Sequence, residues 1–238
     1  MRKNYMPLLG YVVISTLIAF NLPAATPANT TVPVNIKVQS TIPLKIGQVN
    51  ATPSASGLSG IQYAITNSST SRLLAVEVTW ELYFGPGGPE RTVQRADYFL
   101  SPGGKIAPGA SGNLSLGAIV DKRRDGTTTP LKSATATITY AQFANGDQFG
   151  SDIRSVSQSL KNYRDAEMAE YRQVLQDYKT GGATGLNAAL AWEKMPATHG
   201  GRTTWLSLNQ LKKQRGISAV VNELTRVSKL SVPGSAND

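Results

Sequence analysis

The chain has 238 residues, no cysteine, one histidine and a formal net charge of +9, from 24 basic and 15 acidic residues. These counts exclude a disulfide scaffold, a thiol enzyme, a lipid-modified cysteine and a zinc site built from cysteine and histidine. With 40% hydrophobic and 16% charged residues, the composition is that of a globular chain, long enough for one domain or two small ones.

Residues 1–28 show the three parts of a secretory signal. Two basic side chains stand at the start, residues 6–22 carry no charge, and small residues and prolines follow. We expect cleavage after Ala25 or Ala28, which would leave 22 basic against 15 acidic residues and a net charge of +7. An uncleaved membrane anchor is the alternative, because a spanning helix needs roughly 17 to 25 residues.

Four Asn-x-Ser/Thr sequons begin at Asn29, Asn50, Asn67 and Asn113. In a eukaryotic secreted protein they would predict surface glycans. Small extracellular domains made in an oxidising compartment usually carry disulfides, and this chain has no cysteine to form one. We therefore expect a bacterial protein that is periplasmic or secreted after signal cleavage, and we interpret the sequons as by-products of Ser/Thr/Asn-rich strands and turns.

Residues 29–150 alternate apolar and polar side chains with a period of two, which is typical of strands with one buried face. Because no helical pattern intervenes, we expect antiparallel pairing in a two-sheet sandwich. The Asn145-Gly146 turn predicts a short returning edge strand through Phe149. The other strand candidates are 32–38, 42–46, 61–66, 74–84, 92–100, 112–119 and 132–143. The strongest points Val76, Val78, Trp80, Leu82 and Phe84 toward one face.

The order of these strands, Trp80 in the third or fourth of them, and Ile106-Ala107-Pro108-Gly109 before the next strand resemble a known family. They are similar to the immunoglobulin and fibronectin-type-III-like sandwiches of exported bacterial proteins. The resemblance implies an all-β immunoglobulin-like antiparallel sandwich over residues 29–150. The chain departs from the family in lacking a cysteine pair across the sheets and in having Gly112 where a fibronectin-type module often has its corner tyrosine.

From residue 151 the apolar spacing changes to three and four residues, which predicts an α-helical C-terminal region over residues 151–238. An amphipathic helix is expected over 152–179, ending at Gly181-Gly182, with Arg164 and Glu167 interrupting its apolar arc as an ion pair. Three further helices are expected over 186–195, 206–215 and 218–230. The segment 197–204 is expected to be a linker, and Gly216 to separate the last two helices.

The sequence predicts no catalytic residue, no cofactor and no metal site. Glu77 and Glu81 share a strand face but stand about 13 Å apart along it, beyond the roughly 5 to 9.5 Å that glycosidase carboxyl pairs use; we interpret that face as solvated. His199 stands in a predicted loop, and no Gly-x-Ser-x-Gly motif accompanies it. The segment 121–126 places cations between its acids, unlike a calcium loop, and is interpreted as a charged turn.

The excess of basic residues is explained by solubility alone, or else by weak contact with anionic envelope polymers or lipids rather than with nucleic acid. Residues 210–224 superficially resemble a helix-turn-helix, but Lys212 stands where a small residue is expected, and an export signal removes the protein from cytosolic DNA. The apolar arc of helix 152–179 must be covered. The cover is expected to be the sandwich or the later helices, or else another envelope protein or a second copy.

These observations favour a non-enzymatic exported module, a binding or structural protein of the bacterial cell envelope. It would act through the helical tail and through the sandwich loops 85–91, 101–110 and 120–130. The alternative is an envelope hydrolase acting on carbohydrate or peptide, with His199 or an acid pair such as Asp97 and Asp121 brought together by the fold. A pocket with two carboxyl groups at catalytic distance would favour that alternative.

Overall fold

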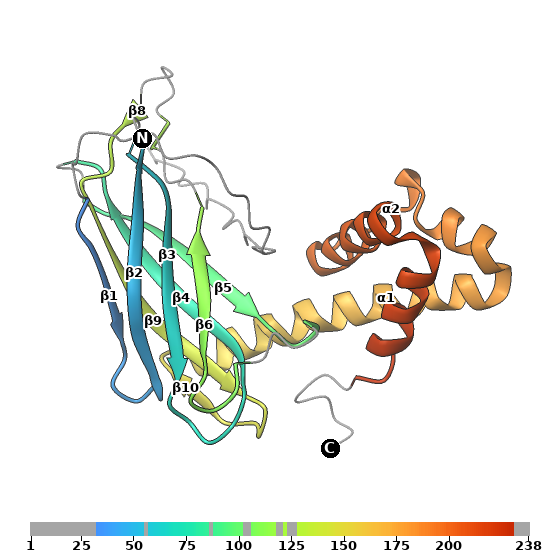
Figure 1. Ribbon diagram of the computed structural model, residues 1–238, viewed down its shortest axis with the longest axis horizontal. Coiled ribbons are helices and arrows are strands. Elements are labelled where there is room, and N and C mark those ends of the chain that lie inside the picture. The colour runs from blue at the N-terminus through green and yellow to red at the C-terminus, as the bar shows by residue number, and fades with distance from the viewer. Residues whose placement is uncertain are drawn as a thin grey trace, which may run out of the picture. The chain divides into compact units, whose positions relative to one another are not determined.

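The computed structural model describes residues 32–54, 57–85, 88–101, 106–117, 121–122 and 128–230. The predicted signal at 1–28 lies outside the described residues, as do parts of all three predicted sandwich loops. The chain divides into two compact units, residues 1–153 and 154–238. Strands make up the first unit and helices the second (Figure 1). None of the described helices is both long and apolar enough to cross a membrane.

The strand unit is a sandwich of two sheets and a small ribbon. One sheet has the order β1-β9-β4-β5 with β10 also paired to β9, the second has the order β2-β3-β6, and β7 pairs with β8. The strands are β1 (Val34–Val38), β2 (Leu44–Ser54), β3 (Gly57–Asn67), β4 (Leu73–Tyr83), β5 (Glu90–Asp97), β6 (Ser111–Leu116), β7 (Asp121–Lys122), β8 (Thr128–Thr129), β9 (Ser133–Phe143) and β10 (Gln148–Gly150).

The prediction of an all-β immunoglobulin-like antiparallel sandwich is wrong, because β1 runs parallel to β9 and makes its sheet mixed. One edge of β9 is taken by β4, so β1 and β10 share the other: β10 pairs at residues 140–142 and β1 at 134–138. The chain leaves the sheet where Gly150 has a φ of 126° and Asp152 a φ of 52°. A Cβ on Gly150 would clash with the carbonyl oxygen of Thr139. The turn cuts β10 short, and β1 fills the remaining edge.

The alternation of the strongest predicted strand is confirmed. Its five inward side chains are buried in one core together with residues of β3 and β9, and Trp80 is fully buried. The strands predicted at 42–46 and 61–66, which correspond to β2 and β3, were too short. These strands continue to residues 54 and 57 through two register shifts. Leu58 in this extension is fully buried, and Val49 and Ala51 pack against the core, so side-chain burial as well as main-chain pairing extends the hairpin.

A buried amide, Gln94 on β5, ties the two sheets together. Its Oε1 accepts hydrogen bonds from Tyr63 Oη at 2.9 Å and from Trp80 Nε1 at 3.1 Å, and its Nε2 donates to the Ser115 carbonyl oxygen at 2.7 Å. Gln94 and Trp80 belong to the first sheet, whereas Tyr63 and Ser115 belong to the second. The bonds close the sandwich along β5 and β6, the two edge strands on that side.

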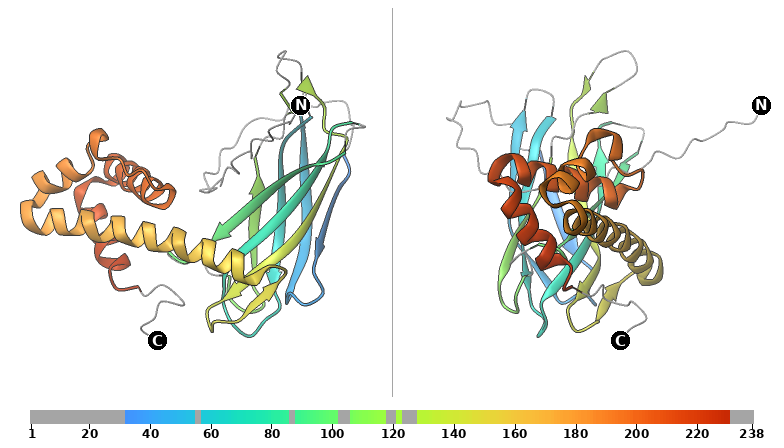
Figure 2. Two further views of the ribbon diagram at one scale, coloured as in Figure 1. Left: turned by 180° about the vertical axis from the view of Figure 1, so that it is seen from behind. Right: turned by 90° about the vertical axis from the view of Figure 1, so that its right-hand side faces the viewer.

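The helical unit contains α1 (Ile153–Ala189), the short 3₁₀ turn η1 (Trp192–Lys194) and α2 (His199–Val227), shown from two further sides in Figure 2. The predicted interruptions at Gly182 and Gly216 are confirmed, since both glycines have positive φ, 56° and 80°. The predicted linker at 197–204 is wrong. Thr198 caps α2 by accepting a hydrogen bond from the Gly201 amide at 3.3 Å, so the helix begins at His199.

Candidate functional site

The two helices meet closely at the start of α2. Gly200 is buried there, and a Cβ on it would stand 2.5 Å from the Tyr163 carbonyl oxygen and 3.2 Å from the Ala166 Cβ. The rings of Tyr163 and His199 lie 5.7 Å apart at the same crossing. Gly200, which has no Cβ, allows this close approach. At this point the chain's own α2 covers the apolar arc of α1.

A cluster of polar groups lies farther along the same interface. Tyr171 is buried on α1, and burial raises its pKa; the nearby carboxylates of Glu223 and Glu167 raise the pKa further, while Arg226 opposes them. Arg226 binds Glu223 through two hydrogen bonds, Nε to Oε2 at 2.8 Å and Nη2 to Oε1 at 2.7 Å, and this pairing raises the pKa of the guanidinium. These charges are engaged within the helical unit.

The two residues predicted to interrupt the apolar arc are also inside this unit. Arg164 is 1% exposed and Glu167 is buried. A buried guanidinium is stable only when its charge and its donors are satisfied, and both residues have interaction partners. The arc is therefore not purely apolar, and its charged positions are part of the packed interior.

An aromatic pair marks the connection between the helices. Trp205 is buried on α2, and its Nε1 donates to the Ala189 carbonyl oxygen at 3.3 Å. Trp192 of η1 packs edge-on against it with ring centroids 5.9 Å apart, yet remains 68% exposed. Leu206, the next residue after Trp205, is 49% exposed. The most exposed large hydrophobic side chains of the described residues thus flank one anchored tryptophan.

A basic stripe runs along α2 beside this pair. We define it as Arg202, Leu206, Gln210 and Lys213, which are all exposed and recur at intervals of three and four residues. Residues at that spacing lie on one side of a helix. Within the unit, Lys161 pairs with Asp165 at 2.6 Å, whereas the stripe itself contains no acidic residue. The stripe therefore presents two exposed cations and one exposed apolar side chain on one side of α2.

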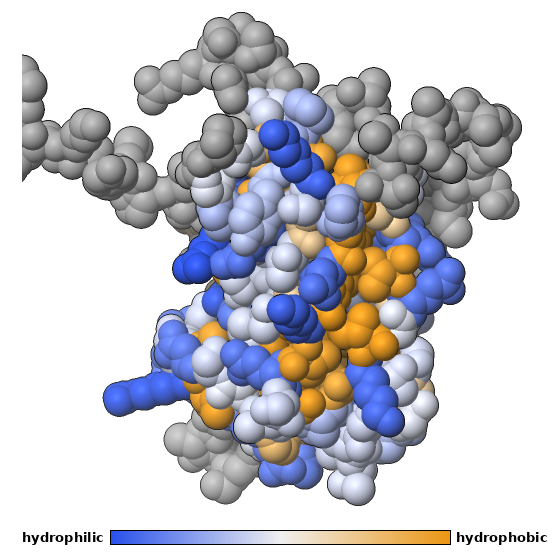
Figure 3. Space-filling view, turned by 90° about the vertical axis from the view of Figure 1, so that its left-hand side faces the viewer, coloured by the Kyte–Doolittle hydropathy of each residue, from blue (hydrophilic) through white to orange (hydrophobic). Residues whose placement is uncertain are grey.

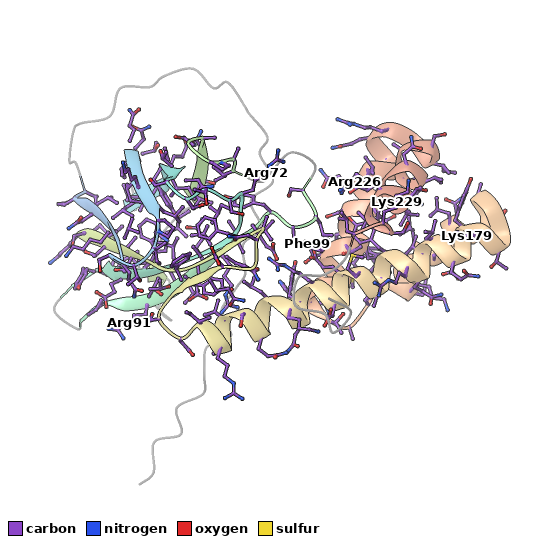
Figure 4. The ribbon with its side chains drawn as sticks, turned by 90° about the horizontal axis from the view of Figure 1, so that it is seen from below. Arg72, Arg91, Phe99, Lys179, Arg226 and Lys229 are labelled. Carbon is purple, nitrogen blue, oxygen red and sulfur yellow. The ribbon has the colours of Figure 1, made fainter. Side chains whose placement is uncertain are left out.

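Positive charge is concentrated in the helical unit as a whole. Residues 154–230 contain twelve lysines and arginines against six aspartates and glutamates, whereas residues 32–153 contain ten against eight. Figure 4 shows three of the basic side chains, Lys179 on α1, Arg226 in the last turn of α2 and Lys229 just beyond it. The sandwich unit is thus nearly balanced, and most of the chain's excess charge lies on the helices.

The carboxylates weighed for glycosidase chemistry are held in ion pairs. Glu77 is buried, accepts from Arg95 Nε at 2.7 Å and is also bonded to Thr139 Oγ1 at 3.2 Å. Glu81 pairs with Arg91 at 2.8 Å. The interpretation of a solvated sheet face is therefore wrong for Glu77, because the cross-strand arginine and further residues enclose that position.

Among the described side chains, those named for the hydrolase alternative do not come together in a catalytic arrangement. His199 is exposed at the first turn of α2, beside Tyr163. Asp97 accepts a hydrogen bond from the Phe99 amide at 3.0 Å, as in a turn. The side chain of Asp121 lies outside the described residues. Among the described residues, no group of three or more His, Asp and Glu is placed to hold a metal ion.

Of the sequons, Asn67 is in a position that no glycan could occupy. Its side chain is 0% exposed; Nδ2 donates to the carbonyl oxygens of Ser71 and Ile106, and Oδ1 accepts from the Ser69 amide. A glycan would remove these bonds, which organise the turn between β3 and β4. Asn50 and Asn113 are exposed, and Asn29 lies outside the described residues.

No protein-family model matches the chain, and a search of curated proteins finds no match. Among solved structures, the chain is similar to the X-ray structure of a hypothetical protein from Peptoclostridium difficile 630. The two are 14% identical with a TM-score of 0.32, over 51% of this chain and 92% of that chain. A likeness of that degree supports no statement about fold or function.

Proposed function

We propose that the protein is an exported, non-enzymatic binding module of the bacterial cell envelope, and that its helical unit contacts anionic groups of envelope polymers or lipids. The export part of the proposal is supported by the charge and hydropathy pattern of residues 1–28. The binding part is carried by one observation, the twofold excess of basic over acidic residues in the helical unit.

The physical reasoning begins with where the charge lies. A cluster of cations on one compact unit raises the local concentration of anions, and each lysine or arginine near an anionic surface contributes about 1 kcal/mol. The basic stripe places two such cations on the same side of α2, with Leu206 between them. Tryptophan is enriched at membrane–water interfaces, because its ring is apolar and its N–H is polar. Trp192 and Leu206 supply apolar contact where the stripe supplies charge.

Co-sedimentation with vesicles tests this function. The chain beginning at residue 29 is mixed with vesicles of zwitterionic lipid, with or without an added anionic phospholipid, at low and at high salt. We expect binding to the anionic vesicles and its loss at high salt, because exposed charges are screened within about 10 Å at 0.1 M salt. Equal binding to both vesicle types, or binding to neither the anionic vesicles nor a soluble polyanion, would contradict the proposal.

A further inference from the structure

The sandwich is open along the side opposite to Gln94. There β1 is the edge strand of one sheet and β2 the edge strand of the other. Aliphatic side chains of both strands pack against the core but stay partly exposed; Figure 3 faces the side on which β1 lies in Figure 1 and shows a band of apolar side chains. We call this band the seam. Its residues are Val32, Val34, Ile36 and Val38 on the first side and Ile46, Val49 and Ala51 on the second.

Beyond β9 and β3, no described strand pairs with β1 or with residues 44–51 of β2, so each has a hydrogen-bonding edge that no described strand occupies. β1 is paired only with β9, and the eleven-residue β2 only with β3. A free edge offers main-chain donors and acceptors to another strand. Beside that edge, the seam presents apolar side chains at strand spacing. These are the two requirements for strand addition, in which the main chain provides affinity and alternate side chains fill apolar positions.

The charge around the seam selects the kind of segment that would fit. The first 76 residues contain no aspartate or glutamate, so β1, β2 and β3 have no carboxylate. Lys37 on β1 and Lys45 on β2 are both exposed. In the β4–β5 pair, by contrast, Glu77 and Glu81 each have an arginine partner. A second copy of the seam strands would bring further lysines and no carboxylate, and residues 29–31 before β1 carry no acid.

We propose that the seam binds an extended segment of a partner protein, added as a strand along the free edge of β2. Apolar side chains at alternate positions of that segment enter the seam. Acidic side chains at the intervening positions point outward beside Lys45. The seam belongs to the strand unit and the basic stripe to the helical unit, so this interaction does not depend on contact between the helical unit and an anionic surface.

Binding of labelled peptides tests the proposal directly. One peptide alternates valine and glutamate over the length of β2, a second alternates valine and lysine, and a third has the composition of the first with the valines grouped together. We expect the full chain from residue 29 to bind the first peptide and to protect the amides of β2 from hydrogen exchange. Opposite charges across paired strands favour the first peptide over the second by about tenfold.

A charge reversal on the outer face of β2 supplies the matched variant. Lys45→Glu leaves the core untouched and is expected to weaken binding of the glutamate peptide several-fold and to strengthen binding of the lysine peptide. Lys132→Glu, an exposed change of the same charge outside the seam strands, is expected to alter neither. Failure to bind the first peptide, equal binding of the first and third, or protection only of amides outside β2 would overturn the proposal. A seam-dependent dimer that blocks the peptide would show a second copy as the occupant instead.

Discussion

Replacing Gln94 with leucine is expected to destabilise the sandwich unit by about 3 kcal/mol. The side chain is buried and makes three hydrogen bonds, two of which it accepts from Tyr63 and Trp80. Without the amide, the Tyr63 hydroxyl and the Trp80 N–H stay buried with no acceptor, and each costs about 1 to 3 kcal/mol. The Ser115 carbonyl oxygen is only partly buried and adds less. Burial of the leucine side chain offsets about 1 to 2 kcal/mol of this loss.

A double-mutant cycle isolates this network. Tyr63→Phe alone removes one bond and is expected to cost about 1 kcal/mol. Gln94→Leu together with Tyr63→Phe is expected to cost about 1 to 2 kcal/mol less than the sum of the single changes, because no hydroxyl is left without an acceptor. Gln62→Leu, an exposed glutamine on β3, is the matched control and is expected to change stability little.

Native-state hydrogen exchange of amides in β3 and β9 measures the opening free energy of the sandwich separately from the helices. A loss below about 1 kcal/mol for Gln94→Leu, or strict additivity in the cycle, would refute the reasoning that this amide closes the sandwich edge.

Three further predictions concern other buried positions. Burial raises the pKa of Tyr98 to about 12, so its contribution to stability is fully present below about pH 10, the unfolded value, and is lost as the pH rises toward 12. Tyr98→Phe also removes a buried hydroxyl that has no hydrogen-bond partner among the described residues, and it is expected to flatten the alkaline fall in a pH series of urea unfolding. Gly200→Ala is expected to destabilise the helical unit by about 1 to 3 kcal/mol, since its Cβ would meet the Tyr163 carbonyl oxygen. Gly181→Ala, at a position with open space around the Cβ, should be neutral or slightly stabilising. Thermal melts followed by α-helical circular dichroism compare the two variants, and equal melting temperatures would contradict the packing described. Asn67→Ala is expected to cost more than 2 kcal/mol, because four hydrogen bonds of a buried amide are lost, and urea unfolding showing a loss under about 1 kcal/mol would count against that role.

The elements that could be predicted are those in which burial or backbone conformation restricts the residue type. Alternation in β4 identifies Trp80 and its neighbours as core, and Gly182 and Gly216 mark the helix breaks because a positive φ suits glycine. Strand direction could not be predicted, since alternation defines faces and is the same for parallel and antiparallel pairing. β1 pairs with residues 134–138 of β9, the part of that edge beyond the three residues that β10 occupies.

The candidate surfaces were only partly accessible to sequence analysis. The excess of basic residues predicts contact with anions, but the stripe on α2 emerges only once residues 199–204, predicted as linker, are found to be helical. The seam could not be predicted, because the same alternation describes a closed and an open sandwich edge. The one sequence feature that pointed to the seam was the absence of acidic residues before Glu77. The burial of Gln94 could not be predicted, because a single glutamine in a strand usually faces water.

The central claim, that the basic stripe of the helical unit contacts anionic groups, is tested most directly by neutralising two of its cations. The variant Arg202→Ala with Lys213→Ala is compared with Arg72→Ala with Lys132→Ala, which removes the same charge from exposed positions of the sandwich. In titrations with anionic vesicles at low salt, we predict about a 30-fold loss of affinity for the first pair and little change for the second. Equal losses for the two pairs would contradict the claim, because they would show that net charge alone governs binding.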